Sequence, residues 1–312
     1  MNRTVPVLGS IAGLLVLLAV GAFSGGYQIY IANLLLVFIV LSLGLHVVIG
    51  EAGQFALAHA AFYGIGIYVA ALTTNAWGLP FPLPILAAGL VAGLIGIGLG
   101  AVALRMRDIY LALATFAFGE AMQWVFSTWT GVTGGPNGLH ISPTRVFGIT
   151  ILNDTAAYPL VAALTVLMVA IAVLLSRSRA GRSFRAVRES EVAAVAMGVP
   201  VRRTKIAAFA ISAAFAGVAG GMFSIFSTYI NPDSLGFQTT ITVLTMVVVG
   251  GLGSIFGAVS GAILFGLASE FLRQAPSYQE IIYGGILMFF MMFAPRGFFS
   301  GIADRLEASR RG

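Results

Sequence analysis

Long apolar stretches separated by short polar segments run along almost the whole chain. A helix needs about 20 mostly apolar residues to cross the hydrocarbon layer of a bilayer. Runs near this length predict about ten membrane segments, which are Val5–Phe23, Ile29–Gly50, Gln54–Thr74, Leu83–Leu104, Tyr110–Trp129, Tyr158–Ser176, Ile206–Thr228, Phe237–Gly250, Ser254–Leu272 and Glu280–Phe293. The pattern therefore predicts an all-α fold, a polytopic transmembrane helix bundle with residues 1–312 in a single domain.

Two of these segments are interrupted in a similar way. Val47–Gln54 recurs in outline as Val247–Ser254, each with a Gly-x-x-Gly break between two apolar runs. The run before the second break is short for a full crossing, so a half-helix or re-entrant segment is expected there. Paired interrupted helices in the two halves of a chain are typical of a substrate path, because the freed backbone groups must line a cavity or pack inside protein. The alternative is that these glycines only allow tight packing or turns.

Composition supports a membrane protein. Hydrophobic residues make up 59% of the 312 residues and charged residues 9%, whereas a soluble domain carries roughly a quarter of its residues as charges. The chain has no cysteine, which excludes disulfides and cysteine nucleophiles. Its three histidines, His46, His59 and His140, do not have the spacing of metal ligands.

The positions of the basic residues predict the orientation. Arginine and lysine gather on the cytoplasmic side of membrane proteins, and here they cluster in residues 177–205, at Arg105 and Arg107, and in the tail 296–312. Alternate crossings place Arg3 on that same side. We therefore expect both termini to be cytoplasmic, with a coupling loop at 177–205 and a periplasmic loop at 131–157. Because the net charge of +6 resides in short loops, it does not indicate nucleic-acid binding.

A short capped helix is expected inside the basic loop. Ser190 is a good N-cap, Glu191 suits the positive end of a helix, and Gly198 followed by Pro200 can end it. A helix of about two turns is not stable alone in water, so it needs packing, and its two central alanines would let another protein approach closely. We expect a docking element rather than a loop that only holds the topology. The residues assigned to this contact are Arg185, Arg188, Glu189, Ser190, Glu191, Ala193, Ala194 and Gly198.

The motif Glu191-x-Ala193-Ala194-x-x-x-Gly198 resembles the EAA loop through which ABC importer permeases engage their ATPase subunits. More narrowly, the chain resembles the LivM-type permeases of branched-chain amino acid ABC importers from about Leu43 to Gly297. The stretches that carry this resemblance are Gly53–Gly66, Leu113–Glu120, Thr133–Leu139, Arg185–Gly198, Asn231–Ser234, Val249–Gly257 and Pro295–Gly297. Ala56, Ala58 and His46 depart from the family's frequent serine, glycine and asparagine, which leaves the exact substrate open.

The resemblance implies a complex in the bacterial inner membrane. Its other members would be a homologous second permease, two cytoplasmic ATPases and a periplasmic binding protein. The transported solute would be a branched-chain or similar small apolar amino acid, with urea, amides or aromatic acids as alternatives. The sequence has no Gly-x-x-x-x-Gly-Lys-Ser/Thr phosphate loop and Lys205 is its one lysine. We therefore expect a transport subunit that is no enzyme and has no cofactor of its own, with ATP and magnesium used by the partner ATPases.

Glu120 lies near the middle of the fifth predicted span, where an unpaired carboxylate is costly and a functional role is the default hypothesis. It would bind the ammonium group of an amino acid, or hydrogen-bond His59 or a backbone amide. The alternative is a neutral or satisfied carboxyl that locks two helices together. His59 itself reads mainly as a packed, hydrogen-bonded histidine. The residues assigned to the substrate path are Gly50, Gly53, Gln54, His59, Glu120, Gly250 and Gly253.

The expected mechanism is alternating access, in which ATPase closure moves the Ser190–Gly198 helix as a lever and rocks the spans about the glycine breaks. The rival from another class is a secondary transporter that uses Glu120 as a proton or cation site. The capped docking helix and the scarcity of other ionisable groups in the spans argue against it. A membrane enzyme lacks any nucleophile–base or metal constellation in this sequence.

Overall fold

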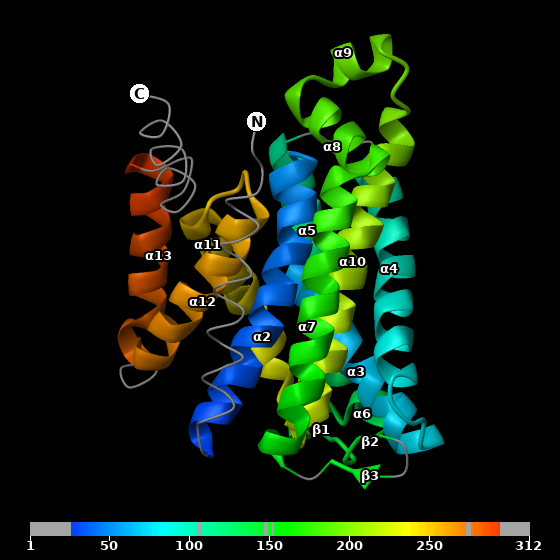
Figure 1. Cartoon of the computed structure of the whole chain (residues 1–312), viewed down its shortest axis with the longest axis vertical. Helices are drawn as coiled ribbons and strands as arrows, with labels where there is room; N and C mark the ends of the chain where they lie inside the picture. Colours follow the sequence, from blue (N-terminus) through cyan, green and yellow to red (C-terminus); the bar gives the residue numbers. More distant parts are fainter. Residues whose placement is uncertain are drawn as a thin grey trace.

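A computed structural model describes residues 26–104, 106, 108–146, 149–151, 153–272 and 276–293, and these form a mostly helical bundle (Figure 1). The α-helices are α2 (Tyr27–Leu45), α3 (His59–Trp77), α4 (Leu83–Ala103), α5 (Asp108–Thr128), α6 (Thr130–Thr133), α7 (Asp154–Arg177), α8 (Arg179–Glu189), α9 (Glu191–Ala196), α10 (Val201–Phe226), α11 (Phe237–Gly250), α12 (Ile255–Leu272) and α13 (Pro276–Phe293). A π-helix, η1 (His46–Glu51), continues α2, and two 3-10 helices are η2 (Gly135–Asn137) and η3 (Pro232–Leu235).

Several predictions fall outside the described residues. These are the first span Val5–Phe23 with Arg3, the basic pair Arg105 and Arg107, and the tail 296–312. Each predicted segment between Ile29 and Phe293 coincides with one of the long helices α2–α5, α7 and α10–α13. Among the described residues, five helical spans are long and apolar enough to cross a membrane, in α2 with η1, α4, α5, α7 and α10.

The outer surface of the bundle is apolar. Leu86, Leu90 and Leu94 follow one another every fourth residue on α4, and each exposes more than half of its surface. Residues spaced by four lie on one face of a helix. This face of α4 thus forms an uncovered leucine stripe, as expected for a helix that meets lipid or another membrane helix rather than water.

α10 is the central helix and packs against α2, α3 and α4. Its glycines allow this close approach: a Cβ on Gly217 would lie 2.5 Å from the carbonyl oxygen of Ala88 on α4, and a Cβ on Gly220 would lie 2.7 Å from the amide nitrogen of Ile67 on α3. Small residues at helix crossings are what allow backbones to meet inside membranes. α3 and α4 are therefore held against α10 by backbone-to-backbone packing.

Two very short sheets depart from the all-α prediction. β1 (Leu139–His140) pairs antiparallel with β4 (Tyr229–Ile230), and β2 (Arg145–Val146) pairs with β3 (Ile149–Thr150). The paired β2 and β3 belong to the segment 131–157, which was expected to be a periplasmic loop. The strands lie at one end of the bundle and α8 and α9 lie at the other (Figure 1); we call these the strand end and the basic end.

Candidate translocation and coupling site

The first Gly-x-x-Gly break, at Gly50–Gly53, interrupts the helix over more residues than the sequence indicated. The π-helix η1 follows α2, residues 53–58 lie in neither a helix nor a strand, and α3 begins only at His59, so the span predicted from Gln54 starts too early. Side chains of distant helices hold the unwound backbone. The hydroxyl of Thr115 accepts a hydrogen bond from the Leu57 amide at 2.8 Å, and that of Thr240 accepts one from the Ala60 amide at 3.2 Å. These bonds satisfy main-chain donors that would otherwise be unpaired inside the bundle.

The second break is a tight turn between two closely packed helices. α11 ends at Gly250, the end predicted from the sequence, and α12 begins at Ile255. A Cβ on Gly250 would overlap the carbonyl oxygen of Gly257, and a Cβ on Gly261 would overlap that of Met246. The glycines of this break therefore allow close packing, as the simpler interpretation held, and they also end the half-length helix.

The structure brings the two breaks together. A Cβ on Gly50 would overlap the carbonyl oxygen of Leu252, which lies in the turn of the second break. The same Cβ would lie 2.5 Å from Nδ1 of His46. Gly53 adopts a left-handed conformation with φ of 66°, which glycine reaches without strain. Two similar sequences 200 residues apart thus meet at one point, beside α8 at the basic end of the bundle.

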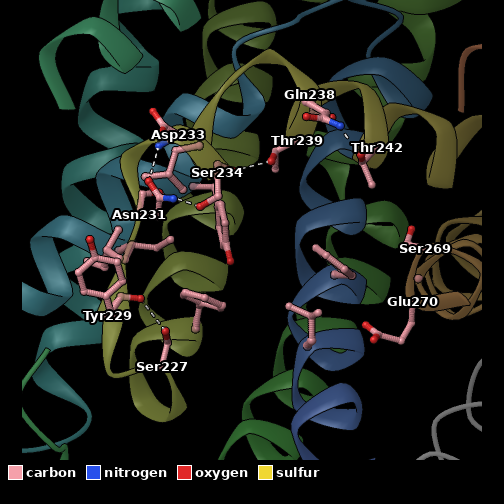
Figure 2. A pocket seen from close by; sticks show the side chains of 18 of the residues that line it. Ser227, Tyr229, Asn231, Asp233, Ser234, Gln238, Thr239, Thr242, Ser269 and Glu270 are labelled. Carbon is pink, nitrogen blue, oxygen red and sulfur yellow. Dashed lines mark hydrogen bonds between the residues drawn. The ribbon is translucent and has the colours of Figure 1, made fainter. Parts of the chain in front are cut away.

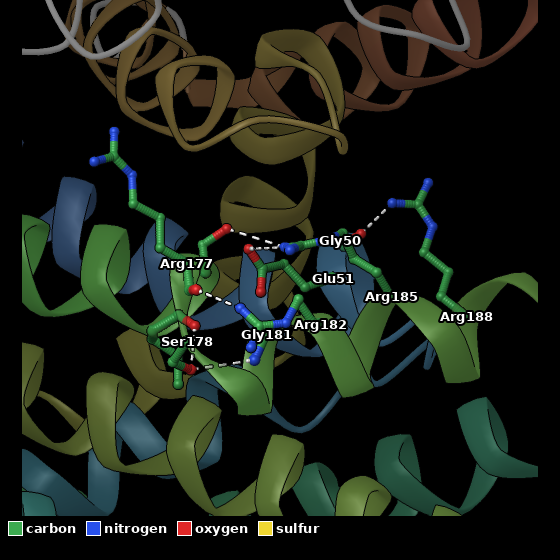
Figure 3. A network of polar contacts seen from close by, with 10 residues as sticks. Gly50, Glu51, Arg177, Ser178, Gly181, Arg182, Arg185 and Arg188 are labelled. Carbon is green, nitrogen blue, oxygen red and sulfur yellow. Dashed lines mark hydrogen bonds and ion pairs between the residues drawn. The ribbon is translucent and has the colours of Figure 1, made fainter. Parts of the chain in front are cut away.

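Two arginines of the basic loop point toward the first break (Figure 3). A guanidinium nitrogen of Arg185 lies 3.7 Å from a carboxylate oxygen of Glu51 and donates a hydrogen bond to the Ser176 hydroxyl at 3.2 Å. Arg188 donates a hydrogen bond to the carbonyl oxygen of Gly50. Both residues were expected to contact another protein, and within their own chain they also connect to the break.

Buried polar atoms surround this junction. Within the described part of the chain, Nδ1 of His46, Oε2 of Glu51 and both amide atoms of Gln54 are buried without a hydrogen-bond partner. Such atoms are rare in folded proteins, since each costs free energy until a partner reaches it. A π-helix inside an α-helix is likewise frequent at functional sites. The junction of the breaks is therefore a place where a rearrangement would gain hydrogen bonds, and it holds most of the buried unpaired polar atoms of the described bundle.

The capped helix predicted in the basic loop is confirmed as α9. The Ser190 hydroxyl accepts a hydrogen bond from the Ala193 amide at 3.2 Å, and Gly198 has φ of 79° just after the helix. Nζ of Lys205, on the first turns of α10, lies 2.5 Å from the Glu191 carboxylate. The 177–205 segment is thus mostly helical, and its end is already part of α10.

The exposed face of α9 agrees with the expected one only in part, since Ala193 is exposed and Ala194 is not. Ala194 is 3% exposed, so it packs against its own chain, whereas Val192, Val195 and Met197 are 82%, 62% and 84% exposed. These three residues, which we call the α9 apolar face, were missed in the sequence, although apolar residues in a basic loop gave a signal. Glu189 is exposed nearby. An apolar face at the tip of the basic end suits a protein partner.

Glu120 is exposed on α5, so it does not lock two helices of this chain together. It borders a small cavity lined by Leu57, Ala60, Ala61, Phe116, Gly119, Glu120, Leu235, Gly236, Phe237 and Thr240. The cavity has a volume of about 10 Å³, close to the smallest space that holds one water molecule. In this conformation the cavity beside Glu120 is therefore too small for an amino acid.

His59 lies outside this cavity. It is 3% exposed, and its Nε2 bonds the carbonyl oxygen of Leu41 at 2.8 Å, so it is a packed, hydrogen-bonded histidine, as the main interpretation held, and its bond goes to α2 and not to Glu120. Of the residues assigned to the path, Glu120 borders the cavity, while Gly50, Gly53, Gln54 and Gly250 belong to the junction of the breaks. Gly253 is exposed in the second turn.

Comparison with known proteins identifies relatives along nearly the whole described chain. Residues 27–293 match the family described as the permease component of branched-chain amino acid transport systems. The chain is 36% identical to the high-affinity branched-chain amino acid transport system permease protein LivM of Escherichia coli K12 over 291 residues, covering 86% of this chain and 68% of LivM.

More distant relatives carry related names. The permease protein LivH of the same bacterium is 27% identical, and BraD of Pseudomonas aeruginosa is 28% identical; each alignment covers 82% of this chain and 89% of the relative. No solved structure matches the chain.

Proposed function

Because this chain belongs to the family of branched-chain amino acid transport permeases, we propose that it is the membrane-spanning subunit of an ATP-driven importer of branched-chain or similar small apolar amino acids. The observation that carries the proposal is the α9 apolar face, presented on a capped helix at the basic end. Exposing three large apolar side chains to water costs free energy, and a docked protein would remove that cost by covering them. Two cytoplasmic ATPases are the proposed occupants, and they would use ATP and magnesium.

A second, homologous permease completes the proposed path. LivM and LivH are two permease proteins of one bacterium, and both are similar to this chain. Glu120 shares the exposed face of α5 with Leu113 and Trp124, which are 57% and 67% exposed. A carboxylate on a helix face that meets lipid is costly. We therefore place the face of α5 against the second permease, with the path between the two subunits.

The helix ends at the closed cavity suit a zwitterion. α3 and α11 both begin beside α5, and the residues before them, Ala58 and Gly236, offer no side chain that caps the helix; in α3 the Thr240 hydroxyl accepts a hydrogen bond from the Ala60 amide instead. The N-terminus of a broken membrane helix favours a carboxylate. Glu120 is the matching group for an ammonium. When the cavity opens, one amino acid would thus find an anion site and a cation site in the same place.

The contacts at the first break support a lever mechanism. A movement of α9 would be passed to α8, which is adjacent in the chain, and from Arg188 to the backbone at Gly50. Because Gly50 touches the turn at Leu252, both breaks would move together. Their displacement would shift the starts of α3 and α11 and open the cavity at Glu120 to one side at a time.

Orientation and location follow from the same proposal. The basic end would face the cytoplasm and the strand end the periplasm, where a binding protein would deliver the solute, and both termini would be cytoplasmic. The chain would cross the bacterial inner membrane in about ten segments, some of them re-entrant.

The test is a pull-down from membranes with a tag on this chain, followed by identification of the co-purifying proteins and an ATPase assay. Wild type should recover ATPase subunits and a second permease, and Val195→Glu should lose the ATPase subunits only. Ser142→Glu, an exposed residue near the strand end, is the control. Glu191→Lys is a poorer choice, because it would place two ammonium groups where Glu191 now pairs with Lys205.

The ion-coupled transporter is the outcome that contradicts the proposal. A wild-type chain that purifies alone and moves leucine into liposomes without ATP would favour it. The Val195→Glu and Ser142→Glu variants would then behave alike.

A further inference from the structure

A cavity of about 500 Å³ lies between α2, α10, α11, α12 and α13, apart from the closed one at Glu120 (Figure 2). This volume falls in the range of roughly 300–1,000 Å³ that is usual for small-molecule sites. Its walls come from segments far apart in the sequence, among them Tyr30 on α2, Phe223 on α10, Thr242 on α11 and Glu270 on α12. The fold therefore builds a ready hollow that can hold an amino acid in the present conformation.

The charged groups of the cavity are acidic. Among the described residues that line it, Asp233 and Glu270 carry charge and none is arginine, lysine or histidine. Figure 2 shows Glu270 and Ser269 on one side, Asn231 and Ser234 on the other. The Tyr27 hydroxyl donates a hydrogen bond to Glu270, which fixes this carboxylate in the wall. A hollow lined by one sign of charge concentrates ions of the other sign.

Aromatic rings complete the chemistry. Tyr30, Tyr63, Phe223 and Tyr283 line the same cavity, and Tyr63 packs edge-on against Phe223 with ring centroids 6.0 Å apart. Aromatic faces attract cations and also cover apolar groups. The lining thus fits a molecule with an ammonium group at one end and an apolar side chain at the other.

The first turn of α11 separates this cavity from the closed cavity at Glu120. Leu235 lines both cavities, Phe237 and Thr240 line the closed one, and Gln238 and Thr239 line the open one. The start of α11 is therefore a common wall. Because the two hollows share this wall, the occupant of the open one is best identified with the solute that the permease transports rather than with an unrelated amine.

We propose that this cavity is a second amino acid site of the permease, in which Glu270 receives the ammonium group and the aromatic rings cover the apolar side chain. The inference rests on the proposed function for the identity of its occupant, and its charge can be measured independently of transport.

The absence of cysteine from the sequence makes a direct test possible. Thr242→Cys places a thiol in the cavity wall, and Ser142→Cys places one on the exposed surface near the strand end as a control. Each thiol in the assembled complex is treated with a cationic trimethylammonium-ethyl or an anionic sulfonato-ethyl methanethiosulfonate. The thiolate forms a mixed disulfide with the reagent and releases methanesulfinate, so the two rates can be measured and divided.

The cation-to-anion rate ratio at Thr242→Cys should exceed that at Ser142→Cys by about tenfold, because the cavity carboxylates attract one reagent and repel the other. Adding Glu270→Gln, which keeps an acceptor for Tyr27, should bring the ratio toward the control value. Leucine should slow the reaction at Thr242→Cys and leave Ser142→Cys unchanged.

Three results would overturn the inference. A thiol at position 242 that reacts with neither reagent would mean that the hollow is filled. Equal cation-to-anion rate ratios at positions 242 and 142 would show that the cavity does not attract cations. If leucine does not slow the modification of the thiol at position 242 in a complex that still takes up leucine, the cavity is no amino acid site. The proposed function would be unaffected by that result. Failure of the proposed function would appear separately, as absence of ATP-dependent uptake in wild type.

Discussion

Gly50→Ala places a methyl group where the two Gly-x-x-Gly breaks touch. Its Cβ would lie 2.5 Å from Nδ1 of His46 and closer still to the carbonyl oxygen of Leu252. Non-bonded heavy atoms reach their best separation at about 3.5–4.0 Å, so the breaks must move apart by about 1 Å. The substitution should therefore disturb the junction without adding charge or polarity.

The expected cost follows from two contacts. Forcing a methylene-sized group into a packed site costs about 1–3 kcal/mol. Displacing the Gly50 carbonyl from Arg188 weakens a hydrogen bond to a charged group, worth about 1.5–3 kcal/mol. Alanine recovers about 0.5–1 kcal/mol of helix propensity relative to glycine. The net destabilisation should be about 2–5 kcal/mol, enough to lower the melting temperature clearly.

Gly98→Ala is the matched control. It makes the same substitution within α4, where no described atom lies within 4 Å of the new Cβ, so it should match wild type or be slightly more stable. The assay is the melting temperature of the purified complex in detergent, together with ATP-dependent leucine uptake in vesicles. If Gly50→Ala had the same melting temperature and the same uptake as Gly98→Ala, the two breaks would not be in tight contact and the reasoning would be refuted.

Two further predictions concern charged residues. Arg188→Gln should keep ATPase activity and assembly but lower uptake about tenfold or more, because the bond from Arg188 to the Gly50 backbone carries the movement. Arg182→Gln is the control and should leave both activities unchanged, because the Arg182 guanidinium bonds the nearby Arg177 carbonyl. Equal effects of the two variants would argue against the lever mechanism. Glu120→Gln should lower uptake about tenfold or more by loss of one ion pair with the ammonium group, with normal co-purification of the partners. Uptake at the wild-type level would remove Glu120 from the path, and Asp154→Asn, at the start of α7, is the control.

Most helices of this bundle could be predicted from the sequence, because lipid selects long apolar runs and leaves few other patterns. α11 ends at the predicted glycine, and the Ser190 cap with Gly198 defines α9 from local chemistry alone. The irregular segment 53–58 could not be predicted. Apart from Gln54 its residues are apolar or small, and the hydroxyls that bond it and the first turn of α3 belong to Thr115 and Thr240, which are distant in sequence.

The candidate site was predictable only as separate parts. The two glycine breaks were visible as a repeated pattern, yet their contact depends on how α2 and α11 pack. Arg185 and Arg188 looked like topological or docking charges, because a basic loop has the same composition whichever way its side chains point. The acidic cavity left no local signal, since Tyr30, Asp233 and Glu270 come together only through tertiary packing.

The bond from Arg188 to Gly50 ends on a main-chain oxygen, and this has a consequence for genetics. Any amino acid at position 50 presents that same oxygen, so the arginine places no selection on the side chain there. Selection for glycine comes from the opposite side, where Leu252 and His46 leave no room. Second-site suppressors of a larger residue at position 50 should therefore arise in the turn at 251–253 or at His46, while Arg188 stays invariant among the revertants.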